Sequence, residues 1–304
     1  MAEKPIIEIS TDGLTLIGQG ANADIYRLDE DKIVKLYSTS VKLPLVERER
    51  RFARTAFING IPSAITYNLV RCSGRYGIIF EYLNADTLGR AFTWHPERRT
   101  ELLDKYVSFV KAVHDTPLKS GAFEDIKDVL RSKLPHLERF CGKEECSLLE
   151  ALISQIPEGS AMIHGDLHPG NIMIFHDELM LIDLADVTMG TPLWDLIGIF
   201  RDMVIAPMNP TPELERSIGM PAPMISEIGR SFFASYFGLE NEEAVDGFIQ
   251  KMIPLYAFNT VLFFADRGEE CENVIKYLMR EAVVPRAHEI GEELCAINNL
   301  LQSC

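Results

Sequence analysis

Short apolar runs alternate with polar turn signals in the first part of the chain, a pattern typical of β-strands. The segment from Leu45 to Asn59 differs, because its apolar residues have helical spacing and its charge density is high. Gly60 and Pro62 then form a helix-end signature. We therefore expect a strand-rich unit with one helix. The expected strands are residues 14–17, 24–28, 32–37, 68–72 and 76–83.

After Leu83 the pattern becomes mostly helical, which predicts an α+β protein with a hinge near residues 81–86. The two expected parts are a strand-rich lobe over residues 1–83 and a helix-rich lobe over residues 84–304. In the second part we expect helices over 98–115, 125–156 and from 194 to the end with a break near 207–223, and strands over 161–163, 171–175 and 179–182.

Composition and charge narrow the class of protein. The chain has 304 residues and is 47% hydrophobic, so it can bury a sizeable core. Its net charge of −15 argues against nucleic-acid binding, which usually needs a basic face. Its acidity is compatible with a cationic substrate, although many proteins are acidic for solubility alone. No run reaches the roughly 18 apolar residues of a membrane span, and Met1–Pro5 carries no apolar signal core.

The six cysteines, one of which is Cys304, are scattered and include no C-x-x-C pair. A disulfide framework or a zinc site is therefore not expected, and a reducing cytoplasm is the expected location.

Three oxygen-bearing side chains in the second part suggest phosphoryl transfer. Asp166 and Asn171 lie five residues apart on a loop between short strands, and Asp183 follows at the end of the next strand. Phosphoryl transfer needs a carboxylate to orient and accept the proton of an attacking hydroxyl, and oxygen ligands for Mg²⁺. These three residues supply that set.

The first part offers matching phosphate-binding candidates. Gly18 and Gly20 lie between two expected strands, where glycine lets the backbone approach a phosphate closely. Lys35 lies inside an apolar strand, and Glu49 of the following helix is placed to pair with it. No Gly-Lys-Ser/Thr follows the glycines, so this is not a Walker loop.

Each of these candidates also has a simpler interpretation. The glycines fit an ordinary hairpin turn, and Lys35 fits a solvated strand residue. Glu47 remains an alternative partner for Lys35, and Asp183 fits a strand-end turn. The order of these features along the chain favours a kinase over the simpler interpretations, because it matches the kinase set of roles. The features are, in order, the glycine loop, the strand lysine, the helix glutamate, the hinge, the His-x-Asp-x₄-Asn motif and the strand-end aspartate.

With these motifs the chain resembles the aminoglycoside phosphotransferase and choline kinase family, over about residues 14–200. The most specific motif is Met162-Ile163-His164-Gly165-Asp166-Leu167-His168-Pro169-Gly170-Asn171-Ile172, followed by Leu181-Ile182-Asp183. Glu81-Tyr82-Leu83 is similar to the family's hinge, His114 to its helical histidine, and Trp194-Asp195-Leu196 to the start of its next helix.

The resemblance implies a protein-kinase-like fold and specific roles. Asp166 is the implied catalytic base, Asn171 and Asp183 the implied Mg²⁺ ligands, and Lys35 the phosphate-binding lysine paired with Glu49. The backbone from Glu81 to Leu83 is implied to hold the nucleotide base. By the same resemblance His164 braces the loop, His114 and Asp195 are structural, His168 either lines the site or is structural, and Asp186 approaches the substrate.

Three departures from related patterns matter. Ala85 stands where the hinge motif often has glycine, and Gly165 stands where protein kinases have arginine. The segment between Asp183 and Asp195 is too short for a phosphorylatable activation loop, and it contains no Ala-Pro-Glu. This shortness favours a small-molecule substrate over a protein.

The resulting hypothesis is a Mg²⁺-dependent kinase that uses ATP or GTP and phosphorylates a hydroxyl of a small molecule, such as an aminoglycoside, a choline-like amine or a sugar. The alternatives are a non-catalytic nucleotide-binding pseudokinase and a protein kinase. Acidic residues exceed basic ones after residue 211, which would suit a cationic acceptor. Four aromatics there fit a cation–π box or simply a core: Tyr236, Phe237, Tyr256 and Phe263.

Overall fold

The computed structural model describes residues 6–20 and 22–302, which form two compact units. The first unit contains the chain up to Leu88 together with residues 171–187, and the second contains residues 89–170 and those from 188 onward. The sequence pattern had grouped residues 171–187 with the helical part. The functional division into lobes 1–83 and 84–304 stays a prediction, and Met1–Pro5 and Cys304 lie outside the described residues.

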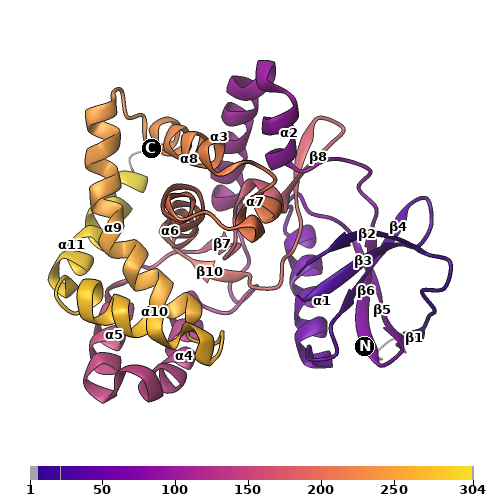
Figure 1. Cartoon of the computed structure of the whole chain (residues 1–304), viewed down its shortest axis with the longest axis horizontal. Coiled ribbons are helices and arrows are strands. Elements are labelled where there is room, and N and C mark those ends of the chain that lie inside the picture. The colour runs from indigo at the N-terminus through magenta and orange to yellow at the C-terminus, as the bar shows by residue number, and fades with distance from the viewer. Residues whose placement is uncertain (1–5, 21, 303–304) are drawn as a thin grey trace. The chain divides into compact units, whose positions relative to one another are not determined.

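The first unit is built on a six-stranded sheet in the order β1-β5-β6-β4-β3-β2 (Figure 1). Neighbouring strands are antiparallel except β1, which runs parallel to β5. Its strands are β1 (Ile7–Glu8), β2 (Thr15–Gln19), β3 (Ala23–Arg27), β4 (Lys32–Tyr37), β5 (Thr66–Cys72) and β6 (Arg75–Glu81). The antiparallel strands follow the predicted runs closely, whereas β1 was not predicted because two residues carry no periodicity.

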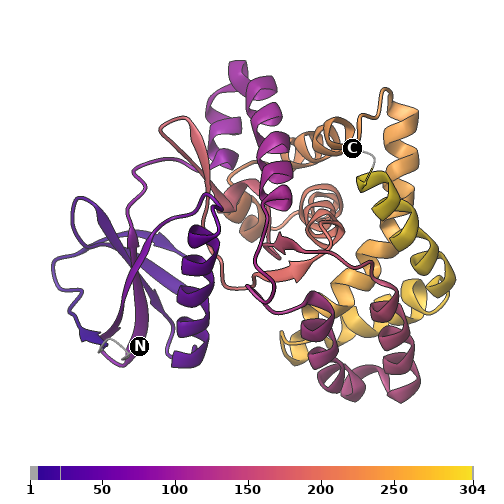
Figure 2. The same ribbon diagram turned by 180° about the vertical axis from the view of Figure 1, so that it is seen from behind.

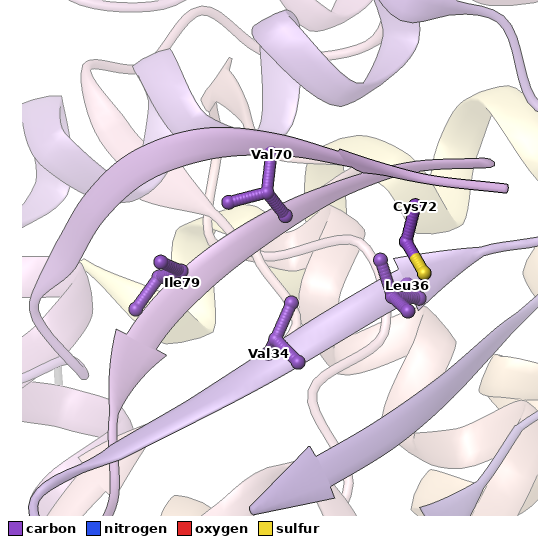
Figure 3. Packing of buried hydrophobic residues seen from close by; sticks show 5 residues of the cluster. All are labelled: Val34, Leu36, Val70, Cys72 and Ile79. Atoms are coloured by element: carbon purple, nitrogen blue, oxygen red, sulfur yellow. The ribbon is translucent and has the colours of Figure 1, made fainter. Parts of the chain in front are cut away.

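Alternation along β4 divides its side chains between the two faces of the sheet. Val34 and Leu36 are buried in one hydrophobic cluster with Val70, Cys72 and Ile79 (Figure 3). Lys35 and Tyr37 therefore point to the opposite face, where Tyr37 joins a second cluster. The strand pattern thus fixes the side of the sheet on which Lys35 lies.

Helix α1 (Leu43–Ile58) packs against β5 and β6 on this second face. Pro44 fits its first turn, where no intrahelical N–H bond is lost, and Gly60 follows its end with φ 87°. Its buried residues recur at helical spacing: Val46, Glu49, Phe52, Ala53 and Ala56. Glu49 is the acidic member of this otherwise apolar stripe.

A hairpin of β8 (Ile172–Phe175) and β9 (Glu178–Leu181) completes the first unit. His176 and Asp177 connect the strands, and both have positive φ, as a type I′ turn requires. Leu181 donates its amide to Pro62 O at 2.8 Å, which attaches the hairpin to the segment before β5. Asp183 lies two residues after the end of β9.

The second unit is mostly helical (Figure 2) and includes a two-stranded sheet of β7 (Ala161–Ile163) and β10 (Thr188–Gly190). Its helices are α2 (Leu88–Trp94), α3 (Arg99–Asp115), α4 (Ile126–Cys141), α5 (Lys143–Gln155), α6 (Leu193–Phe200), α7 (Pro212–Ile218), α8 (Ala222–Phe237), α9 (Glu242–Phe264), α10 (Glu272–Leu278) and α11 (Ala287–Leu301). All eight residues of α6 are buried, and α9 and α11 pack against it.

Two features of this unit differ from the sequence prediction. The region expected to be helical over 125–156 is helical but consists of two helices, because Gly142, with φ 95°, separates α4 from α5. The helix after Trp194 changes to a π-helical turn, η3 (Arg201–Ile205), directly after α6. In the part of the chain that the structure describes, no helix is both long and apolar enough to cross a bilayer. The cysteines in the described residues form no disulfide bonds.

Candidate active-site residues

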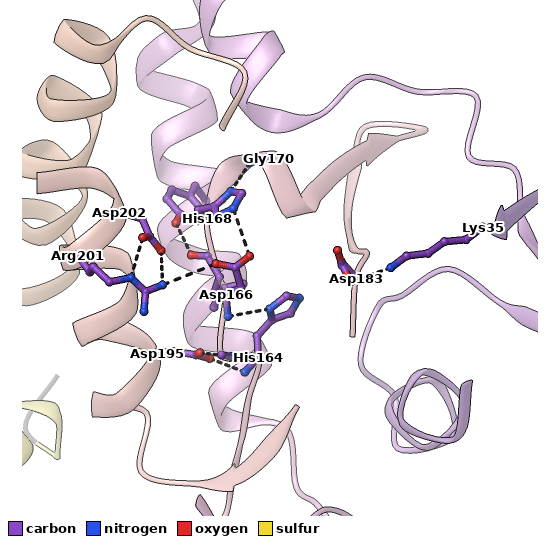
Figure 4. Close-up of polar contacts among 12 residues, drawn as sticks. Lys35, His164, Asp166, His168, Gly170, Asp183, Asp195, Arg201 and Asp202 are labelled. Carbon is purple, nitrogen blue, oxygen red and sulfur yellow. Dashed lines mark hydrogen bonds and ion pairs between the residues drawn. The ribbon is translucent and has the colours of Figure 1, made fainter. Parts of the chain in front are cut away.

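Lys35 of β4 is the centre of an ion-pair cluster in the first unit, and Figure 4 shows its contact with Asp183. Its Nζ donates to Glu49 Oε1 at 2.8 Å and to Asp183 Oδ1 at 2.9 Å. The structure therefore places Glu49 against Lys35, while Glu47 is exposed. A nearly buried cation held by carboxylates from two other segments has a fixed position, as phosphate binding requires.

The charge state of this cluster follows from its surroundings. Burial alone would lower the pKa of Lys35, but the carboxylates of Asp183 and Glu49 outweigh it and raise that pKa above its ordinary value. Lys35 is therefore protonated at neutral pH. Burial raises the pKa of Glu49, and its ion pair with Lys35 offsets only part of this effect. The Tyr37 ring lies beneath Lys35, with Nζ 5.3 Å from the ring centroid.

Asp183 has an unusual backbone conformation. Its φ is 59°, in the left-handed region that aspartate tolerates better than most residues do. The preceding residue, Ile182, donates its amide to Asn171 O at 3.0 Å, which brings the backbones on either side of the hairpin together. The side chain of Asp183 is 49% exposed. Such a conformation in a half-exposed acidic residue is a common feature of functional sites.

Asp186 lies near the same segment but points to a different partner. Arg48 of α1 contacts Asp186 Oδ1 at 3.7 Å and donates to Ala185 O at 3.4 Å. These contacts attach the chain after Asp183 to α1. The substrate role suggested for Asp186 stays a prediction.

The remaining candidates of the first unit lie at strand ends. Gly18 is inside β2 at a register shift, and Gly20 follows the strand; neither has positive φ, and an added Cβ would meet only ordinary contacts at both. The fold therefore does not itself demand glycine there. Glu81 ends β6, and the amide of buried Leu83 donates to no acceptor among residues 6–20 and 22–302.

In the second unit, buried polar contacts hold the loop that follows β7 (Figure 4). Asp195 of α6 accepts hydrogen bonds from His164 N at 2.9 Å and Gly165 N at 2.8 Å, and its Oδ2 lies 3.1 Å from His114 Nε2. His164 Nδ1 in turn accepts from Asp166 N at 3.3 Å. These geometries fit the bracing roles that the resemblance implied for His164, His114 and Asp195.

The carboxylate of Asp166 has a basic group beside each oxygen. His168 Nε2 lies 3.5 Å from Oδ2, and Arg201 Nη2 lies 3.7 Å from Oδ1. The Gly170 amide donates to His168 Nδ1 at 3.1 Å, so Nε2 is the nitrogen that carries the proton toward Asp166. His168 is buried beside Asp166, and this position fits both a site-lining and a structural role.

These neighbours set the charge of Asp166. Burial would raise its pKa, but His168 and then Arg201 outweigh burial and hold the pKa of Asp166 well below its usual range. Asp166 is therefore ionised throughout the neutral range. The side chain is 43% exposed, so solvent also reaches this carboxylate.

Sequence reasoning missed Arg201 and Asp202. Both begin the π-helical turn after α6, and Arg201 makes a two-point ion pair with Asp202 at 2.8 and 2.7 Å. The signal that marks them is a charged pair directly after the apolar run of residues 196–200. Of the four aromatics proposed as a cation box, Phe263 lies against Arg201 and Tyr236 is buried in an aromatic cluster.

The strand-rich unit, its buried Lys35–Glu49 pair and the helical unit together have the elements of a kinase-like fold. The model of the family described as "Phosphotransferase enzyme family" matches residues 13–221. The chain belongs to this family, which confirms the predicted resemblance. No curated protein sequence matches the chain.

Solved structures confirm the fold. The ADP-bound aminoglycoside phosphotransferase APH(2'')-Ib is 16% identical, covers 95% of this chain and 94% of its own, and has a TM-score of 0.53. The streptomycin–ATP complex of APH(2'')-IIa is 16% identical, with coverages of 91% and 93% and a TM-score of 0.55. A choline/ethanolamine kinase family protein from Mesorhizobium loti is 13% identical, with coverages of 92% and 92% and a TM-score of 0.54.

Proposed function

We propose that this protein transfers the γ-phosphate of ATP or GTP to a hydroxyl group of a small molecule. The observation that carries the proposal is Lys35, which is held between Glu49 and Asp183 and stays protonated. Membership of the phosphotransferase enzyme family supports the reaction class. The ADP in one structural neighbour and the ATP in another support a nucleotide donor.

The nucleotide would be bound by residues of the first unit. Gly18 and Gly20 leave room beside the backbone at β2 that the fold does not use, which suits a phosphate approaching closely. The unpaired Leu83 amide would donate to the nucleotide base, and Glu81 would contribute through its backbone. Lys35 would bind phosphate oxygens by charge and hydrogen bonding.

Asn171 and Asp183 fit the ligand chemistry of Mg²⁺, which prefers carboxylate and amide oxygens and takes its remaining ligands from phosphate and water. Among the residues that the structure describes, no group of three or more His, Cys, Asp or Glu is placed to hold a metal. A bound Mg²⁺ supplies charge neutralisation at the phosphate oxygens.

Asp166 would orient the acceptor hydroxyl and take its proton. Because its pKa is low, it is a weak base, and its main contribution would be orientation before the proton is transferred late in the reaction. This role suits a loose transition state, in which the hydroxyl needs little deprotonation before attack.

The acceptor would be a small molecule. The short segment from Asp183 to Asp195 offers no activation loop for a protein substrate, and two neighbours were solved with streptomycin and with gentamicin. The candidate classes are aminoglycosides, choline-like amines and sugars.

A panel of these acceptors, read by release of ADP or GDP with Mg²⁺, tests the proposal. We expect turnover with at least one acceptor, and loss of turnover with retained nucleotide binding in Asp166→Ala. Asp128→Ala, at a largely exposed position on α4, is the control. An active Asp166→Ala protein would contradict the assigned role. Nucleotide binding without turnover on any acceptor would favour the pseudokinase alternative, and phosphorylation of a protein would favour a protein kinase.

A further inference from the structure

Arg201 is a buried arginine beside Asp166 that the proposed reaction does not account for. Its side chain is 8% exposed, and its guanidinium carbon lies 3.7 Å from the centroid of the Phe263 ring. Nε and Nη2 donate to the two carboxylate oxygens of Asp202, while Nη1 donates to Asn259 Oδ1 at 3.2 Å. Stacking and hydrogen bonds from η3 and α9 thus fix the plane of this guanidinium.

The surroundings of Arg201 do not require Asp166. Asp202 already balances its charge by a two-point ion pair. The second hydrogen of Nη2 remains, and Nη2 lies 3.7 Å from Asp166 Oδ1. This distance corresponds to an ion pair rather than a direct hydrogen bond, and such contacts often shorten once substrate is bound.

We propose that Arg201 is a positioning residue that orients the carboxylate of Asp166 toward the acceptor hydroxyl. This proposal rests on the proposed function. Arg201 and His168 hold different oxygens of Asp166, so together they restrict its rotation. The fixed tautomer of His168 and the fixed plane of Arg201 make both partners rigid. The π-helical turn that begins at Arg201 is a local irregularity frequently found at functional sites.

The charges around Asp166 are consistent with this role. The groups that act on Asp166 are His164 and His168 of its own loop and Arg201 of η3. Asp202 of η3 acts on His168 and Arg201. Tyr256 of α9 faces Arg201. After His168, Arg201 is the next contributor to the lowered pKa of Asp166.

The test compares Arg201→Met, which removes the charge, with Arg201→Lys, which keeps a charge but loses the planar fork. Arg230→Met is the matched control, because Arg230 pairs with Glu242 and Asp246 of α9 instead. Two readouts are needed: the pH profile of kcat, and the pKa of Asp166 from an NMR titration with ¹³C-labelled aspartate, assigned with Asp166→Asn. Circular dichroism checks folding.

We expect Arg201→Met to raise the pKa of Asp166 by about one unit, since it loses a nearby opposite charge. Its kcat should fall roughly 10- to 100-fold, because a misplaced reacting group costs that much, while KM for the nucleotide changes little. Arg201→Lys should keep the pKa but lose kcat, and Arg230→Met should change neither.

A folded Arg201→Met protein with unchanged kcat and unchanged Asp166 pKa overturns the proposal. If Arg201→Met does not fold, the test rests on Arg201→Lys. A kcat of Arg201→Lys equal to that of the wild type also overturns the proposal. If the wild-type protein phosphorylates no acceptor, the proposed function fails by itself. The titration still tests Arg201 in that case, and an unshifted Asp166 pKa in a folded Arg201→Met protein counts against the positioning role.

Discussion

Lys35 Nζ and Asp183 Oδ1 are 2.9 Å apart although 148 residues separate them along the chain. The contact joins β4, one of the two central strands of the N-terminal sheet, to the second residue after the β8–β9 hairpin. Glu49 holds the same ammonium from α1 at 2.8 Å. Glu49 and Asp183 thus hold one cation from two other segments of the chain. The proposed roles are phosphate binding for Lys35, Mg²⁺ binding for Asp183 and positioning of Lys35 for Glu49.

Lys35→Met should abolish most activity and also destabilise the first unit. The substitution leaves Glu49 buried without its cation, a loss that costs about 3 kcal/mol in the free energy of unfolding. The double variant Lys35→Met/Glu49→Gln should recover much of the stability but none of the activity, because the uncompensated charge is gone while the phosphate ligand is still missing. Urea unfolding and nucleotide turnover measure the two effects.

Lys32→Met is the control for this prediction. Lys32 lies on the same strand, but its side chain is 39% exposed and pairs with Asp29 on the surface. Equal losses of activity in Lys32→Met and Lys35→Met would contradict a special role for Lys35.

Asp183→Asn and Asp183→Ala should both lose Mg²⁺-dependent nucleotide binding but differ in stability. Asparagine tolerates the positive φ of this position, whereas alanine does so at a cost of about 1 kcal/mol. Thermal unfolding with ATP, with and without Mg²⁺, tests both points. A Mg²⁺-dependent shift in Asp183→Asn as large as that of the wild type would remove Asp183 from the proposed metal ligands.

Asp195→Ala should destabilise the second unit by about 3 kcal/mol or more, because two buried amides and His114 lose their acceptor. The loop that carries Asp166 should lose its order at the same time. Chemical denaturation measures the stability, and Asp128→Ala, a surface change, should stay within about 0.5 kcal/mol of wild type. A similar stability for the two variants would rule out the bracing role.

Cys141 should resist alkylation at pH 8 while Cys295 reacts. Burial raises the pKa of the Cys141 thiol to about 11, so little thiolate is present at pH 8, whereas Cys295 is exposed. The rate at Cys141 should increase as the pH rises toward that value. Iodoacetamide labelling followed by peptide mass spectrometry gives both rates, and faster labelling of Cys141 at pH 8 would be inconsistent with the structure.

Gly170→Ala should destabilise the protein by roughly 2 kcal/mol, because an added Cβ would lie 1.9 Å from the backbone oxygen of Ser217. Gly247 of α9 is the matched control, since no atom lies within 4 Å of its added Cβ. Gly247→Ala should therefore stabilise the helix by about 0.5–1 kcal/mol. Melting temperatures compare the two, and the same direction of change in both would be evidence against the close contact.

The local periodicity of the sequence was enough to predict most of the sheet and α1, because alternation and helical spacing are strong there. The sequence also offered Glu49 as a partner for Lys35 but left Glu47 as an alternative, and only the family resemblance favoured Glu49. Periodicity missed β10, whose three residues form a strand only because β7 offers its edge. It also missed the break at Gly142, because the apolar spacing continues across that residue.

The same limit applies to the candidate site. Asp166, Asn171 and Asp183 were marked by a compact motif, whereas Arg201 lies far along the chain, where no spacing connects it to Asp166. Its importance depends on packing against Phe263 and Asn259, which come from another helix. Only the folded structure shows such a contact. The catalytic and binding roles of Asp166, Asn171 and Asp183 stay predictions.

The discontinuity of the first unit has a consequence for the order of synthesis. Its six sheet strands are complete once residue 81 has been made, but the segment that supplies Asp183 is made about a hundred residues later. During translation, which runs at about 5–20 residues per second, Lys35 and Glu49 therefore spend several seconds without their third partner. A nascent chain stalled before the hairpin would carry the sheet but not the complete cluster.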